Sequence, residues 1–359
     1  MIWFKMRAGN GLLFTKLNIE YMKNIFILLG VAAISFSCEN QDIKFEDYKN
    51  NAVYFPYQTP LRTLILGDEV IGDNTIDLEH AFSVGVAIGG MFENLSDREV
   101  MIELAPELID SVVSENGDTL EILPSAYYDA TFDKITIPKG GFFGKLRVNL
   151  NDAFFNDPKT TGLHYVLPLR IIDTDADSIL SGLALVPDPD PRVVENWEIP
   201  PQNYTLFGIK YINPFHGVYL LRGLRTSSVD TLVYSERFLT DNGMVELSTK
   251  TLDESVMSII GGNKTGGKFS ALLSFNESNK TITVSQTDAS SVVINGSGKY
   301  FTKDDPESES YTDQKHRTIY LDYTYEDGGT TYQVNDSLVF IDTGVIFEEF
   351  AFSVLESNK

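Results

Sequence analysis

The stretch Thr318-Ile319-Tyr320-Leu321-Asp322-Tyr323-Thr324-Tyr325 shows the clearest alternation of apolar and polar side chains in the chain. In an extended strand successive side chains point to opposite faces, so the odd-numbered residues share an apolar face and the even-numbered residues a polar one. Glu326–Gly329 then turns the chain back into Thr331–Val334. The pattern predicts an antiparallel hairpin with one buried face.

The rest of the second half repeats this pattern. Leu272–Phe275 and Thr281–Ser285 flank Asn276–Lys280 and predict a second hairpin. About eight meandering strands in roughly 150 residues favour a closed barrel over an open sheet, because closure removes the exposed edges. We therefore expect a closed β-barrel over residues 204–359.

A proline-rich segment precedes this half. Pro187–Pro201 holds five of the fourteen prolines, and proline fixes φ and cannot donate to a sheet ladder. Residues 187–203 are therefore expected to be a stiff linker between two domains.

Residues 51–186 carry short runs rich in β-branched and aromatic residues, separated by Gly, Asn, Asp and Pro. The dipeptide Asn116-Gly117 predicts a tight turn, since both residues tolerate positive φ. Roughly seven short strands at this spacing predict an Ig-like β-sandwich. The fold class expected for the whole chain is all-β. The clearest predicted strands are Ala52–Phe55, Phe82–Ile88, Val100–Leu104, Lys134–Ile137, Lys145–Leu150 and Tyr165–Ile172.

The N-terminal region reads as an export signal. Met22–Cys38 has one lysine, an apolar run too short to span a bilayer, and small residues before Cys38, the only cysteine. Residues 1–37 are expected to be an upstream extension plus a lipoprotein signal peptide that starts at Met22. Cys38 is the expected lipidation site, and residues 38–50 are the expected tether.

The charge limits the partners. The chain carries 28 Lys and Arg against 51 Asp and Glu, a net charge of −23, and removal of residues 1–37 leaves 24 basic against 50 acidic residues. Nucleic acid is not an expected partner, because phosphate contacts need clustered cations. A single cysteine excludes an intrachain disulfide.

Several passages resemble a known family. Ala52–Phe55, Ile122–Tyr128 and Tyr165–Ile171 resemble a domain of glycan-utilisation lipoproteins, which also precedes the catalytic barrel of some family-18 endo-N-acetylglucosaminidases. The second half resembles the lipocalin-like domain that often follows it. The resembling passages there are Phe215–Tyr219 with Arg222-Gly223, Gly298–Tyr300, Thr318–Tyr323 and Asn335–Val339. The resemblance implies an Ig-like first domain, a lipocalin-like (calycin) β-barrel as the second domain, and membership of a Sus-like polysaccharide-utilisation locus.

Neither a catalytic residue, a metal site nor a cofactor is expected. Asp173, Asp175 and Asp177 have the spacing of a calcium loop, but Ser178 replaces the turn glycine and Ala184 the final Glu. Gly262–Lys268 has the spacing of a phosphate loop, but the next residue is Phe269 instead of Ser or Thr.

Sugar binding needs flat aromatic faces and a few polar groups. Tyr311 lies in the polar stretch Lys303–Gln314 and is the preferred exposed aromatic residue. Trp197 is a second candidate, although it can instead pack between the two domains.

The expected function is that of a non-catalytic glycan-binding accessory lipoprotein on the outside of the outer membrane. It would bind an oligosaccharide or polysaccharide near an importer complex. One alternative is a structural or assembly subunit that binds a partner protein. A second alternative is a glycoside hydrolase of unrecognised type, since carboxylates are plentiful and the fold alone can pair them.

Overall fold

The computed structural model describes residues 6–8, 11–13, 50–69, 72–263 and 268–355. Residues 1–47 and 48–359 are separate compact units; in the first, β1 (Met6–Ala8) pairs with β2 (Gly11–Leu13). Cys38 and almost all of the expected signal peptide and tether lie outside the described residues.

Strands dominate the second unit, so the all-β expectation is confirmed. Its described helices are short, and none of them is long and apolar enough to cross a membrane. They are α2 (Thr75–Leu78), α3 (Asp152–Phe155) and the 3₁₀ turns η1 (Pro106–Ile109), η2 (Ser125–Tyr127), η3 (Pro158–Thr161), η4 (Val194–Asn196) and η5 (Leu239–Asp241).

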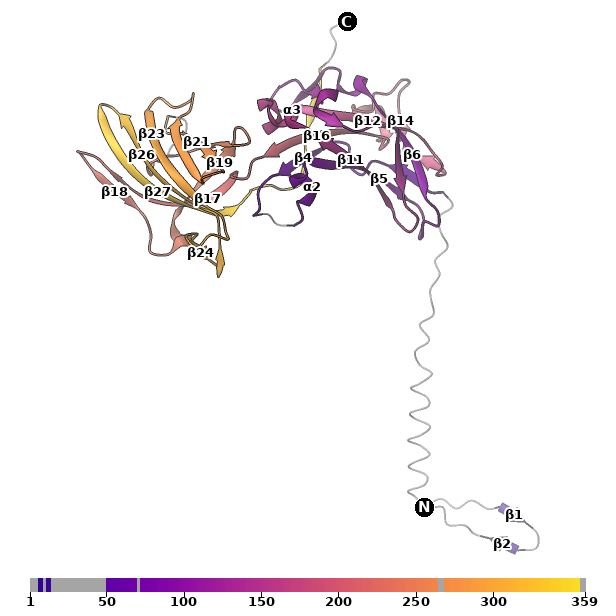
Figure 1. Cartoon of the computed structure of the whole chain (residues 1–359). Coiled ribbons are helices and arrows are strands. Elements are labelled where there is room, and N and C mark those ends of the chain that lie inside the picture. The colour runs from indigo at the N-terminus through magenta and orange to yellow at the C-terminus, as the bar shows by residue number, and fades with distance from the viewer. Residues whose placement is uncertain (1–5, 9–10, 14–49, 70–71, 264–267, 356–359) are drawn as a thin grey trace. The chain divides into compact units, whose positions relative to one another are not determined.

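Residues 48–359 form two domains. The first domain is a sandwich of two sheets (Figure 1). One sheet has the order β10 (Lys134–Ile137), β6 (Arg98–Leu104), β12 (Tyr165–Thr174), β16 (Tyr204–Ile212), β4 (Pro60–Ile65) and β28 (Glu348–Glu349), with β8 (Glu121–Ile122) also on β12. The other has the order β13 (Ser178–Ile179), β3 (Ala52–Tyr54), β5 (Ala81–Gly89), β11 (Phe143–Leu150) and β9 (Tyr128–Asp129). Their facing apolar side chains, such as Val84 and Leu167, form one buried core.

The second domain is a closed antiparallel barrel, drawn in salmon to yellow in Figure 1. Its strands are β17 (Gly217–Thr226), β19 (Gly243–Thr249), β20 (Glu254–Met257), β21 (Ala271–Asn276), β22 (Thr281–Gln286), β23 (Val293–Phe301), β26 (Thr318–Asp327) and β27 (Thr330–Asp342). The barrel closes because β17 pairs with β27 as well as with β19. A short strand, β18 (Thr231–Tyr234), pairs with the far half of β17.

The alternation read from residues 318–325 is observed in β26. Ile319, Leu321, Tyr323 and Tyr325 are buried in the barrel core. Tyr320 and Asp322 face outward and Thr324 is half-buried. Thr318, at the start of the strand, is fully buried, because the loop that precedes it covers that end.

The observed division between the domains differs from the expected one. Tyr204–Ile212, assigned above to the barrel, forms β16 in the first sheet, where it pairs with β12 and in parallel with β4. The chain enters the barrel at Gly217 and returns, so that β28 and β29 (Phe352–Val354) pair with β4 and with β7 (Val112–Ser114). These pairings give β16 two neighbours that lie far away in the sequence, and periodicity along one strand carries no information about them.

The expected linker packs on the first domain. Its β15 (Trp197–Ile199) pairs with β14 (Leu183–Ala184), and Arg192 donates to the carbonyls of Leu108 and Asp110. The segment that does connect the two domains is Asn213–His216.

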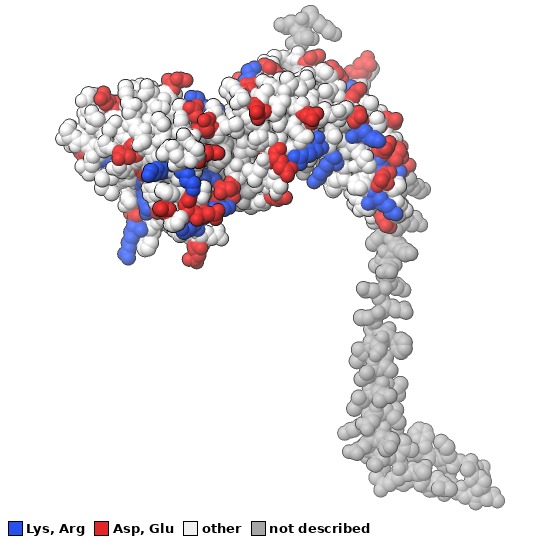
Figure 2. Space-filling model, viewed as in Figure 1, with Lys and Arg blue, Asp and Glu red and all other residues white. Residues whose placement is uncertain are grey.

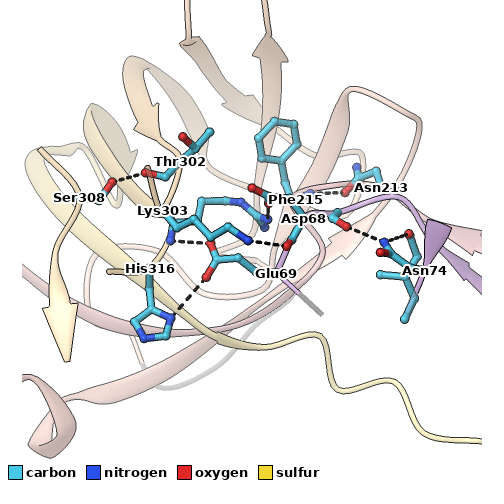
Figure 3. A network of polar contacts seen from close by, with 12 residues as sticks. Asp68, Glu69, Asn74, Asn213, Phe215, Thr302, Lys303, Ser308 and His316 are labelled. Carbon is cyan, nitrogen blue, oxygen red and sulfur yellow. Dashed lines mark hydrogen bonds and ion pairs between the residues drawn. The ribbon is translucent and has the colours of Figure 1, made fainter. Parts of the chain in front are cut away.

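Arg317 lies where the domains meet and is 3% exposed. Its guanidinium donates to Asp68 at 2.8 Å, and its backbone N–H donates to Glu69 at 2.6 Å. Figure 3 shows Asp68 and Glu69 of the first domain pointing toward Lys303 and His316 of the barrel. A buried cation needs such partners, so this contact fixes the junction.

Candidate functional site

An open groove of about 830 Å³ lies on the outer wall of the barrel, over β22, β23, β26 and β27. Directly opposed residues in an antiparallel sheet point to the same face. One row across the strands is therefore Thr281, Lys299 and Tyr320. The next row is Ser297, Asp322 and Asn335.

Two aromatic rings stand at one end of this groove. Tyr320 is 37% exposed, and its ring meets that of Phe301 edge to face, with 5.9 Å between the centroids. Both residues line the groove. A partly exposed aromatic face is the surface on which an apolar face of a sugar ring stacks.

The hydroxyl of Tyr320 is held by Glu309. It donates to Oε1 of this carboxylate at 3.1 Å, and Ser337 donates to the same oxygen at 2.9 Å. Arg222 forms an ion pair with the other oxygen. Burial, followed by the nearby charge of Glu309, raises the pKa of Tyr320 to about 12, so the phenol is neutral at physiological pH. The ring is thus fixed before any ligand binds, which lowers the entropic cost of binding.

The loop between β23 and β26 closes one side of the groove through Glu307. Asp305 anchors this loop, because it accepts from Lys280 at 2.7 Å and from the backbone N–H of Thr302 at 2.7 Å. The hydrogen bond from Lys280 is the main cause that lowers the pKa of Asp305.

Hydrogen-bonding side chains surround the rings. Asp322 accepts from the amide of Gln333, and Asn335 lies opposite it on β27. Lys299 supplies a cation. Figure 2 shows acidic and basic side chains intermixed over the face in view. Flat rings with neutral and mixed-charge polar groups favour a neutral polar ligand over a strongly charged one.

The two candidate aromatic residues from the sequence lie elsewhere. Tyr311 is on β24 (Ser310–Tyr311), which pairs with β25 (Gln314–Lys315) around Thr312 and Asp313. Its ring stacks on His316, with 4.0 Å between the centroids. Trp197 is in the first domain, where its indole N–H donates to the carbonyl of Asp190 at 2.8 Å.

The structure does not bring Tyr311 and Trp197 into one site, since their contacts are in different domains. Tyr320 was not singled out from the sequence, although its signal was visible there. It is the aromatic residue on the polar face of the alternating strand, and that position turns its ring toward solvent.

Within the described ranges, no group of three or more His, Cys, Asp or Glu side chains could hold a metal ion. The aspartates of the calcium-like stretch have protein partners instead. Asp175 accepts from the backbone N–H of Glu99, and Asp177 accepts from Asn51.

Two family models match the chain. One, described as a "-like, N-terminal domain", covers residues 48–178, and the other, a domain of unknown function (DUF5627), covers residues 214–344. The second match begins where the chain crosses from β16 into the barrel. No curated protein matches.

Solved structures of Bacteroides proteins are similar to the chain. A Bacteroides ovatus protein of unknown function is 32% identical with a TM-score of 0.78, covering 86% of this chain and 100% of its own. A second protein of unknown function from the same species is 14% identical, with a TM-score of 0.43 over 84% of this chain and 100% of its own. An auxiliary nutrient binding protein from Bacteroides thetaiotaomicron is 13% identical, with a TM-score of 0.34 over 72% and 82%.

The fold thus defines a two-domain protein in which a β-sandwich is joined to a closed barrel. By its identity to the first Bacteroides ovatus protein over that protein's full length, the chain belongs to the same family.

Proposed function

We propose that the protein is a glycan-binding accessory protein without catalytic activity, and that the groove on the barrel wall binds the sugar. The observation that carries the proposal is the pair Tyr320 and Phe301, with hydrogen-bonding side chains on both sides. Stacking supplies affinity in such a site, because polar sugar contacts largely replace contacts with water.

The same proposal includes the place of the protein in the cell. Cys38 would be acylated and would anchor the chain to the outer membrane, facing outward, where it would present glycan to an importer. The lipobox-like sequence and the resemblance to glycan-utilisation lipoproteins, including the domain that precedes family-18 enzymes, support this part.

The first test is an array of plant, host and microbial glycans probed with the wild-type protein and with Tyr320→Phe. The Phe variant loses the hydrogen bond to Glu309 but keeps the ring, so we expect the same glycans to bind both proteins, within about threefold in affinity. An array without any bound glycan would reject the proposed function.

The absence of catalysis is tested on the glycans that bind. Glu307 and Asp322 both line the groove, and a glycosidase needs two carboxyl groups. We expect no release of reducing ends during prolonged incubation. Release that disappears in Asp322→Asn or Glu307→Gln would instead establish a hydrolase.

A partner protein is the second candidate, and one surface favours it. β18 stands at the end of its sheet, and exposed apolar side chains lie on and beside it: Val229, Val233, Phe238 and Met244. Unpaired strand edges and apolar patches are typical of protein interfaces. A blank glycan array, together with a cell-surface partner whose capture is lost in Val233→Asp, would favour this assembly role.

A further inference from the structure

A second and larger hollow lies at the junction of the two domains. Its volume is about 900 Å³, and both domains contribute to its walls. Clefts between domains are common ligand sites, because they offer two walls and partial exclusion of water. One wall of this cleft is mainly apolar and the other is polar.

The wall from the first domain is built around His80. This residue has φ 55°, a left-handed conformation that few side chains adopt, and its ring lies 4.3 Å from that of Phe155. Leu78, at the end of α2, is 53% exposed beside it. An exposed leucine and an imidazole face together form an apolar platform with a polar edge.

Asp77 fixes this wall to strand β4. This carboxylate is 1% exposed, forms an ion pair with Arg62 and accepts from the backbone N–H of Ile65 at 2.9 Å. Burial raises the pKa of Asp77, while the hydrogen bond from Ile65 and the charge of Arg62 oppose the shift. The helix that carries Leu78 is therefore fixed to β4.

The wall from the barrel is polar. It is formed by the segment Lys250–Asp253 and by Asn276 and Glu277 at the β21–β22 turn. Thr251 donates to Asp253 at 2.9 Å, and Ser278 donates to Asn276 at 2.6 Å, so both turns are ordered.

The two walls are fixed relative to each other by Asn213. This residue is 1% exposed, and its amide donates to the carbonyls of Thr251 and Glu254 at 2.9 and 2.8 Å. The segment between the domains is thereby bonded to the loop that lines the cleft. Together with the contact between Arg317 and Asp68, this bonding makes the cleft a preformed one.

The cleft and the groove on the barrel wall meet at a single hairpin turn. Asn276 lines the cleft and Thr281 lines the groove, and these residues are direct partners in the β21–β22 ladder. Between them, Lys280 is paired with Asp305 of the loop beside the groove. A chain molecule that leaves the groove past Thr281 therefore reaches the cleft after crossing one turn.

We propose that the cleft is a second subsite for the same glycan, so that the protein binds a linear neutral oligosaccharide by an end-to-end pair of sites. The inference rests on the proposed function of the groove. Short oligomers occupy the groove alone, whereas longer ones also reach the platform of His80 and Leu78. The affinity therefore rises with chain length.

The experiment measures affinity by calorimetry against oligomers of increasing length. The probes are β-1,4-linked glucose, xylose, mannose and N-acetylglucosamine series, from disaccharides upward, beginning with whichever series the array selects. The variants are His80→Asn, which keeps a residue that tolerates positive φ, and Leu78→Glu. Leu95→Glu is the matched control, because Leu95 is 65% exposed in the first domain outside the cleft.

We expect wild type and Leu95→Glu to bind longer oligomers more tightly than the shortest one that binds. His80→Asn and Leu78→Glu should weaken the longest oligomers about fivefold and leave the shortest unchanged. Affinity that is independent of length, or equal losses for short and long oligomers, would overturn the inference. If Tyr320→Ala leaves the shortest oligomer bound, the groove is the part that fails; if no series binds, both proposals fall.

Discussion

Asp336 is a carboxylate inside the barrel, on β27 next to Asn335 of the groove. Tyr323 donates to it at 2.6 Å and Tyr234 also donates to it, while the residue is 4% exposed. Burial raises its pKa to about 6, although both hydroxyls act in the opposite direction. A buried acid of this kind makes folding favour the protonated form.

The sign of the pH dependence follows from this shift. The unfolded carboxyl has a pKa of 3.8 and the folded one a pKa of about 6, so between these values only the folded state holds the proton. The contribution of Asp336 to stability therefore grows as the pH falls from about 7 to about 4, by up to about 3 kcal/mol.

The variant Asp336→Asn tests this account, since the amide cannot ionise. We expect the difference in unfolding free energy between wild type and variant to change in favour of wild type as the pH falls through 6. Denaturant titrations at several pH values provide the measurement. A difference that stays constant between pH about 4 and about 7 would contradict the raised pKa.

The positions of some single residues could be predicted from the sequence, and those of others could not. The outward position of Tyr320 follows from the alternation in residues 318–325, because strand geometry is local. The position of Tyr311 does not, because a stacking partner, His316, becomes available only after β24 and β25 have paired. Likewise, neither rows across strands nor a groove can be derived before the register is known.

At the scale of elements, local pattern predicted strands well and their partners poorly. β10 has the predicted bounds, and β21 and β22 form the predicted hairpin. β16 is buried along almost its whole length, so it has no alternation that would assign it to a sheet. The return of residues 348–354 to the first domain is a contact between distant parts of the sequence, which periodicity cannot reveal.

The returning C-terminal segment should contribute to the stability of the sandwich. Phe350 is 8% exposed and packs in the cluster that contains Leu61 and Leu206. Phe350→Ala should lower the free energy of unfolding by about 3 kcal/mol, because it leaves a cavity in that cluster.

Phe347→Ala is the matched control, three positions earlier in the same segment and 63% exposed. This variant should lower the free energy of unfolding by less than about 1 kcal/mol. Equal effects of the two variants in chemical denaturation would show that the segment is not packed against the sandwich as described.

At the scale of the whole molecule, the fold joins two domains through Asn213–His216, the returning C-terminal segment and the buried Arg317 contact. A lipid at Cys38 would place both domains at a membrane surface. A net charge of −23 leaves a neutral glycan largely unaffected, because such a ligand carries no charge for the field to act on.

The anchor is tested by Cys38→Ala in the native cell. We expect the variant to take up no labelled palmitate and to leave the membrane fraction, because the chain has no other cysteine to acylate. Wild type should be labelled and sediment with membranes. Equal labelling of the two proteins would contradict the proposed lipidation.

The central claim is that the outward ring of Tyr320 binds sugar. Calorimetry of Tyr320→Ala against the best glycan of the array tests it most directly, with Tyr311→Ala as the matched tyrosine in the neighbouring loop. We expect Tyr320→Ala to weaken binding about tenfold without a matching loss of thermal stability, and Tyr311→Ala to bind as wild type does. Unchanged affinity in Tyr320→Ala, or a loss confined to Tyr311→Ala, would contradict the groove as the binding site.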